Sequence, residues 1–150
     1  SNLIQAWPVA VCDETGFGNL HIMDTGPGSA NHAFGEPKNF LLDQQAFPHV
    51  QASYSVRLDD LVKSGILPKP DHVKIDVDGF EYKVLAGMEA CLIEGMVDSL
   101  LIEVNSNLQE HWSMVNDLVR LGFRYDVELF EQVVRKEGIH AGTGEIVFRR

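Results

Sequence analysis

The chain has 150 residues with a formal net charge of −10, and hydrophobic residues make up 45% of it. This length and apolar content fit a single packed domain over residues 1–150 and exclude a largely disordered chain. The acidic charge disfavours nucleic acid and anionic membranes as partners, and no apolar run approaches the ~20 residues of a membrane span.

The N-terminus and the cysteines bear on where the protein works. Ser1 and Asn2 resemble a scar left by tag removal, so they are set aside. The first residues lack the basic start and apolar core of a signal peptide. Cys12 and Cys91 lie within apolar patterns and do not suggest a disulfide framework, so we expect a cytoplasmic protein.

The first part of the chain predicts a β-hairpin over residues 8–24, followed by a long loop. Apolar residues at 8–11 and 20–23 indicate two strands, and Gly16-Phe17-Gly18-Asn19 between them is typical of a turn. Residues 26–37 are rich in glycine and proline and predict a loop of a length found in lids and binding loops.

The middle of the chain predicts strands that alternate with helices. Residues 51–56 fit a strand, and a short helix opens at residues 58–62 with Asp59 as its cap. Residues 73–77 form a β-branched strand that ends at Asp78-Gly79. An apolar stripe at helical spacing follows, and Gly87 weakens the middle of that helix and can split it into two.

The last third continues this alternation. Residues 100–104 predict a buried strand, and apolar residues at helical spacing from Trp112 predict a helix that stops at Gly122. Residues 125–130 and 145–148 predict two further strands. The order strand–helix–strand–helix–strand–strand is the pattern of an α/β sheet.

Polar residues lie at the carboxyl ends of two of these strands, where ligands bind in open α/β sheets. Asp76 and Asp78 end the first strand, and Glu103 and Asn105 end the second. Strands joined by one helix are usually neighbours, so we expect Asp76 and Glu103 to face one crevice. A carboxylate there can orient an ammonium group, accept a substrate proton or hold a metal.

Each of these acids also has a structural interpretation. Asp78 and Glu81 have the spacing of a capping box, which we favour over ligand contact. Asp76 lies two residues from Lys74 on the same strand face, so an ion pair and a site are weighed evenly. Glu103 is weighed the same way and leans towards a structural role.

The six histidines have no metal-ligand spacing, and the chain contains no C-x-x-C motif, so no zinc site is expected. His32 lies in the long loop, where a solvated ring is the favoured interpretation and contact with a substrate as a base is the alternative. No nucleophile elbow and no phosphate-binding loop occurs in the sequence.

The run from Val73 to Glu81, followed by Val84-Leu85-Ala86-Gly87, resembles the K-I-D-V-E-G-x-E-x-x-V-L-x-G signature of FkbM-type S-adenosylmethionine-dependent methyltransferases. The segments at 55–61, 101–104 and 121–123 resemble the V-x-L-D-D-L, I-x-E-V and L-G-Y/F segments of that family, so the resemblance spans about residues 8–150. Asp78 stands where the family usually has Glu.

The resemblance implies a Rossmann-like methyltransferase sheet and S-adenosyl-L-methionine as the cofactor. Asp76, Val77 and Asp78 would bind the cofactor, and Asp76 and Glu103 would be catalytic. Asn105 and His32 would contact a small-molecule or sugar acceptor, with residues 26–37 closing over it. No metal is implied.

The resemblance is also incomplete. The glycine-rich D-x-G-A-N-x-G turn of the family is not in this sequence. The chain therefore resembles the C-terminal portion of the catalytic domain, from the third to the seventh strand. We expect it to be inactive alone and to self-associate through the strand at 73–77. A non-catalytic α/β interaction module is the alternative function.

Overall fold

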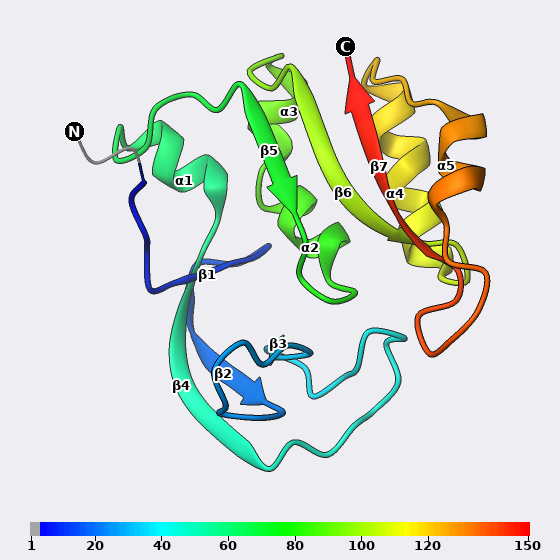
Figure 1. Ribbon diagram of the computed structural model, residues 1–150. Coiled ribbons are helices and arrows are strands. Elements are labelled where there is room, and N and C mark those ends of the chain that lie inside the picture. Colours follow the sequence, from blue (N-terminus) through cyan, green and yellow to red (C-terminus); the bar gives the residue numbers. More distant parts are fainter. Residues whose placement is uncertain (1–3) are drawn as a thin grey trace.

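The computed structural model describes residues 4–150, so Ser1 and Asn2 lie outside the described residues. Strands form two separate sheets, one of four strands in the order β1-β4-β2-β3 and one of three in the order β5-β6-β7. Figure 1 shows the four-stranded sheet and the long loop on one side of the molecule and the helix-backed sheet on the other. The structure thus confirms the α/β class expected from the sequence, as two sheets with helices packed against the second.

The four-stranded sheet is built around β4. It contains β1 (Ala10–Val11), β2 (Gly16–Ile22), β3 (Ala33–Phe34) and β4 (His49–Val56). β4 pairs in parallel with β1 and antiparallel with β2, while β3 pairs antiparallel with β2.

The predicted hairpin over residues 8–24 is therefore wrong, because β4 lies between β1 and β2. The glycines at 16 and 18, expected in a turn, belong to strand β2. A Cβ at Gly18 would meet the ring of Phe34, so this glycine admits an aromatic side chain over the strand and is not a turn residue.

The three-stranded sheet carries the main core. It consists of β5 (His72–Ile75), β6 (Ser99–Asn105) and β7 (Thr143–Arg149). β5 and β6 are parallel, and β7 runs antiparallel to β6. Alternate β6 residues Leu100, Ile102 and Val104 are fully buried and join the core cluster beneath the helices.

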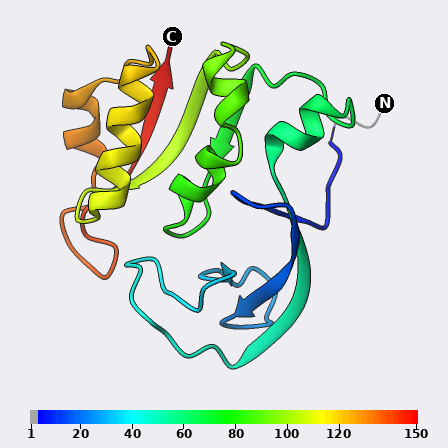
Figure 2. The same cartoon turned by 180° about the vertical axis from the view of Figure 1, so that it is seen from behind.

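Helices cover one face of this sheet, as Figures 1 and 2 show from opposite sides. They are α2 (Glu81–Ala86), α3 (Glu89–Ile93), α4 (Gln109–Arg120) and α5 (Val127–Val133). The break between α2 and α3 at Gly87 confirms the predicted split. No helix within residues 4–150 has the length and apolar character needed to cross a membrane.

Helix α5 replaces the strand predicted at residues 125–130. The Asp126 carboxylate accepts the backbone N–H of Leu129 at 2.9 Å and so caps the helix. Phe130 is buried against the core, whereas Val127 and Leu129 are exposed. The apolar residues suited either element, and the cap favours the helix.

Helix α1 (Leu58–Lys63) forms where the sequence predicts it, but Asp59 does not cap it. Arg57 occupies the N-cap position, and its side chain forms no hydrogen bond that caps the helix. The Asp59 carboxylate instead accepts the backbone N–H groups of Ala90 and Cys91 in α3. The predicted cap therefore belongs to a helix distant in sequence.

Strand β5 is an edge strand. It pairs with β6 alone within residues 4–150. Strand β1 does not pair with this edge, because it belongs to the other sheet and pairs with β4.

Candidate functional site

The loop that follows β5 has an unusual backbone. Asp78 and Gly79 both adopt left-handed conformations, with φ of 55° and 105°. A Cβ at position 79 would lie 3.0 Å from the carbonyl oxygen of Phe40. Glycine is therefore required at 79 both by φ and by the close approach of the 26–45 segment.

Glu81 forms hydrogen bonds with the backbone of this loop. Its side chain is fully buried, and Oε1 accepts the backbone N–H of Val77 at 3.0 Å and that of Gly79 at 3.3 Å. Asp78 does not cap the helix, because its carboxylate accepts the backbone N–H of Asn31 at 2.9 Å. The predicted capping box is therefore wrong for Asp78, and Glu81 bonds the loop that precedes the helix.

His111 of α4 completes this buried polar group. Its Nδ1 accepts the backbone N–H of Asn105 at 3.0 Å, so the ring proton lies on Nε2, which donates to the carbonyl of Gly79 at 3.1 Å. Nε2 also lies 3.4 Å from Oε2 of Glu81. Burial raises the pKa of the Glu81 carboxyl above its ordinary value, although its backbone hydrogen bonds and His111 act in the opposite direction.

Sequence reasoning did not find His111 as a site residue. A usable signal was its helical position: His111 precedes the buried Met114, Val115 and Leu118 by three, four and seven residues. A histidine on the apolar stripe of a helix is buried, and a buried imidazole needs polar partners.

Asp76 lies just beyond β5 with its side chain 48% exposed. Lys74 Nζ is 3.2 Å from its carboxylate and 3.2 Å from that of Glu145 on β7. The structure thus contains the Lys74–Asp76 ion pair that was the alternative to a functional role for Asp76. Because it is exposed, it contributes little to stability and leaves the carboxylate open to solvent.

Glu103 lies in the same row as Asp76. Ile75 of β5 pairs with Ile102 of β6, so the next residues in register are Asp76 and Glu103. On the other side of β6, Glu103 pairs with Glu145 of β7. Glu103 is 3.2 Å from Nη1 of Arg135. The structure therefore brings the two predicted acids to one face of neighbouring strands, each with a basic partner.

Asn105 and His32 are held by local partners. Asn105 is buried, its Oδ1 accepts the backbone N–H of Asn107, and its Nδ2 has no hydrogen-bond partner among the described residues. His32 accepts the backbone N–H of Met23 through Nδ1, and its Nε2 lies 3.2 Å from Oγ of Ser29. The hydrogen bonds of His32 thus stay within its own part of the chain.

The long loop nevertheless reaches the end of β5. Asn31 donates to Asp78, and the Glu36 carboxylate lies 3.1 Å from Nζ of Lys83 in α2. These contacts join the long loop to the loop after β5 and to α2, and closure of residues 26–37 over the candidate site stays a prediction.

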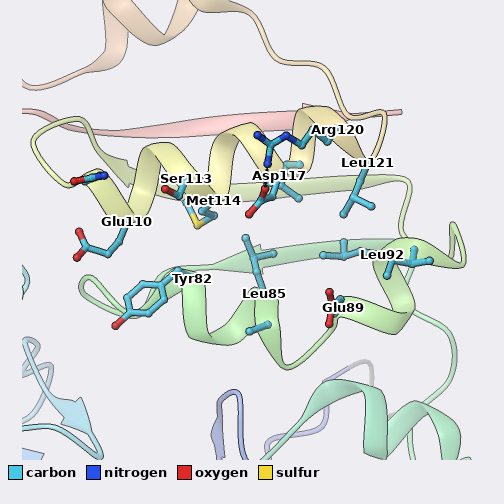
Figure 3. Close-up of a pocket in the computed structure, with 14 residues that line it drawn as sticks. Tyr82, Leu85, Glu89, Leu92, Glu110, Ser113, Met114, Asp117, Arg120 and Leu121 are labelled. Atoms are coloured by element: carbon cyan, nitrogen blue, oxygen red, sulfur yellow. Dashed lines mark hydrogen bonds and ion pairs between the residues drawn. The ribbon is translucent and has the colours of Figure 1, made fainter.

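A groove of about 920 Å³ lies elsewhere, between α2–α3 and α4 (Figure 3). Tyr82, Leu85 and Glu89 line one side, and Met114 and Asp117 line the other. Its lining includes none of the predicted site residues. Within residues 4–150 the structure brings together no group of three or more His, Cys, Asp or Glu side chains suited to a metal ion.

The strand, loop and helix from Val73 to Gly87 thus place the motif at the carboxyl end of β5. The profile of the methyltransferase FkbM domain matches residues 1–126. The chain belongs to this family. The match ends before α5 and β7, so it is shorter than the resemblance over residues 8–150 that the motifs suggest.

A curated relative supports the same assignment over a shorter stretch. The hexuronic acid methyltransferase AglP of Haloferax volcanii is 42% identical to this chain over 50 residues. This match covers 33% of the chain and 20% of the relative. No solved structure matches the chain.

Proposed function

We propose that this chain is part of an S-adenosylmethionine-dependent methyltransferase that methylates a hydroxyl oxygen of a small molecule or sugar. The observation that carries the proposal is the loop Val77–Gly79. It belongs to the family motif, lies at the carboxyl end of a parallel strand, and is fixed by the buried Glu81. The cytoplasm, where S-adenosylmethionine is available, is the proposed location.

The residues present fit one end of the cofactor. When bound, S-adenosylmethionine supplies a methyl group on a sulfonium cation. Asp76 offers a half-exposed carboxylate that suits the cationic methionine end, and Val77 and Asp78 supply the adjoining backbone. The sequence has no D-x-G-x-N-x-G turn to hold the rest, so the chain fits the methionine end alone.

The proposed roles of the acids follow from their surroundings. Asp76 orients the ammonium group of the cofactor or accepts the hydroxyl proton of the acceptor at a carboxylate oxygen. Glu103, held by Arg135, lines the acceptor side beside Asn105. His32 can contact the acceptor only if its ring leaves Met23 and Ser29, so its proposed role is the weakest of the set.

The acceptor class follows from charge. Asp76, Glu103 and Glu145 form a row of carboxylates on one face of the sheet, and Lys74 and Arg135 offset part of that charge. A neutral sugar hydroxyl meets less repulsion there than the carboxylate of a hexuronic acid, the substrate class in the relative's name. We therefore propose a neutral sugar or other small molecule as the acceptor.

A non-catalytic interaction module is the second candidate function. The coding sequence upstream separates the two. A D-x-G-x-N-x-G turn within ~70 residues before Ser1, the room that two strand–helix units need, supports the enzyme. Its absence from that stretch supports the module.

Calorimetric titration of the 150-residue chain with S-adenosylmethionine tests the fit. We expect weak binding, because only the methionine end has its partners. Micromolar affinity would contradict this expectation and show that another element completes the site. Formation of S-adenosylhomocysteine with a panel of neutral sugars and uronic acids, by the protein that includes any upstream turn, tests the reaction and the acceptor class.

A further inference from the structure

Two buried side chains join the carboxyl ends of β5 and β6. Glu81 accepts the backbone N–H groups of Val77 and Gly79, and His111 bonds the carbonyl of Gly79 and the N–H of Asn105. The imidazole of His111 therefore connects the loop after β5 directly to the last residue of β6. These are the two segments on which the candidate site residues lie.

The hydrogen bonds fix the state of the imidazole. Nδ1 faces a backbone N–H and must accept, so the proton is on Nε2 and points to Gly79. Oε2 of Glu81, 3.4 Å from Nε2, has no hydrogen-bond partner of its own among the described residues. Glu81 is fully buried and His111 is 2% exposed, so water does not compete for these bonds.

Packing alone does not explain this pair. The helices around it are already joined by apolar residues such as Leu85, Met114 and Leu118. Burying a carboxyl and an imidazole is unfavourable compared with apolar side chains of similar size unless they form specific hydrogen bonds. All four backbone groups that the pair bonds lie in the loop after β5 or at the end of β6, so its effect is to hold these two segments together.

The loop needs such support. Asp78 is not a glycine, yet its φ is 55°, a conformation that persists only where the surroundings enforce it. The bonds of Glu81 to Val77 and Gly79 lie on both sides of Asp78 and enforce that conformation.

We propose that Glu81 and His111 form a positioning unit that sets the placement of Asp76 and Asp78 relative to Asn105. Its relevance to ligand binding rests on the proposed function, whereas its effect on the loops does not. Glu81 acts through Val77 and Gly79, and His111 acts through Gly79 and Asn105.

Amide hydrogen exchange by NMR on the 150-residue chain tests the unit directly. Glu81→Ala should raise the exchange rates of the Val77 and Gly79 amides at least tenfold beyond any change in global unfolding, and His111→Ala should do so for Asn105. Val115→Ala, on the same helix α4 and equally buried, is the matched control because it loosens the core without touching these bonds. Exchange rates in the Glu81 and His111 variants that equal those in the control would overturn the proposal.

Conservative variants separate the two bonds of His111. His111→Asn keeps an acceptor near the position of Nδ1 and should protect the Asn105 amide, whereas His111→Gln keeps a donor near Nε2 and should not. If Glu81→Ala does not fold, Glu81→Gln, which retains an acceptor at Oε1, should keep the Val77 and Gly79 amides protected. Loss of protection in Glu81→Gln, or equal protection of Asn105 in both His111 variants, would contradict the assigned bonds.

Titration with S-adenosylmethionine, followed through the Val77 and Gly79 amide shifts, links the unit to the site. We expect saturable shifts in the wild type and at least tenfold weaker binding in Glu81→Ala and His111→Ala than in Val115→Ala. Binding as tight as in the control would overturn the role in ligand placement. An unresponsive wild type would contradict the proposed fit of the methionine end to this chain, while the exchange rates would still decide the positioning unit.

Discussion

The carboxylate of Asp59 accepts the backbone N–H of Cys91 at 3.0 Å across 32 residues of sequence. Its other oxygen accepts the N–H of Ala90, also at 3.0 Å, so one side chain satisfies two free donors at the start of α3. Because Asp59 lies in α1, this fork of two hydrogen bonds joins α1 to α3, one of the helices that cover the three-stranded sheet.

Replacing Asp59 with Ala should lower the free energy of unfolding by about 1–2 kcal/mol, the usual cost of losing a helix cap. Chemical denaturation at neutral pH measures it. Asp98→Ala, at an exposed aspartate, serves as the control and should change stability by less than about 0.5 kcal/mol. Equal effects of the two substitutions would show that the fork does not stabilise the fold.

The same carboxylate predicts a pH dependence. Burial raises the pKa of Asp59, but hydrogen bonds from Cys91 and Ala90 outweigh it and bring the pKa below its ordinary value of 3.8. A lowered folded-state pKa means that the stabilisation is present above that ordinary value and is lost as pH falls through the folded-state pKa. The stability difference between wild type and Asp59→Asn should therefore shrink below about pH 4, as denaturation curves at several pH values would show.

In the protein that includes any upstream cofactor-binding turn, Asp76→Asn should reduce methyl transfer far more than it reduces stability. The ion pair with Lys74 is exposed, so its loss should leave the melting temperature near the wild-type value. Asp117→Asn removes another exposed ion pair, with Arg120 on α4, and is the matched control, expected to keep near-normal turnover. A clear drop in melting temperature for Asp76→Asn with unchanged turnover of the folded protein would establish a structural role instead.

Gly87→Ala should lower the free energy of unfolding by about 1–3 kcal/mol, because an added Cβ would overlap the backbone carbonyl of Cys12. Gly16→Ala is the control, since nothing lies within 4 Å of a Cβ there. Thermal unfolding of both variants measures the difference. Similar melting temperatures would mean that the Cys12 segment can move away at little cost.

Self-association through β5 remains a prediction. The outer edge of this strand forms no ladder within residues 4–150, and unpaired strand edges are templates for pairing. Light scattering of the 150-residue chain should give a mass that rises with concentration. A mass of 16.7 kDa at every concentration would rule out pairing between copies.

Local patterns were sufficient for β5 and β6 of the helix-backed sheet, but they predicted a strand at 125–130 where helix α5 forms. Strands at 73–77 and 100–104 and the break at Gly87 follow from β-branched runs, helical spacing and one helix-weakening residue. They were insufficient where distant pairing decides. The glycines of β2 suit a turn, but seven residues of β4, from His49 to Ser55, pair with β2 and make it a strand.

The candidate site also contains one relationship that local patterns predicted and one that they did not. Asp76 and Glu103 could be placed together because strands joined by one helix are usually neighbours and each acid lies near the carboxyl end of its strand. The partnership of Glu81 with His111 could not, because it depends on how α2 and α4 pack and on a backbone conformation at Asp78 that the sequence does not specify.

No β-ladder joins the two sheets anywhere in the described chain. Isolated contacts connect them instead, among them Asn31 with Asp78, Glu36 with Lys83, and the approach of Phe40 to Gly79. Each can open without breaking a strand pair, so the two sheets can unfold in separate steps. A molecule held between Asp78 and the long loop would make their unfolding more cooperative, and its binding would appear as a sharper melting transition.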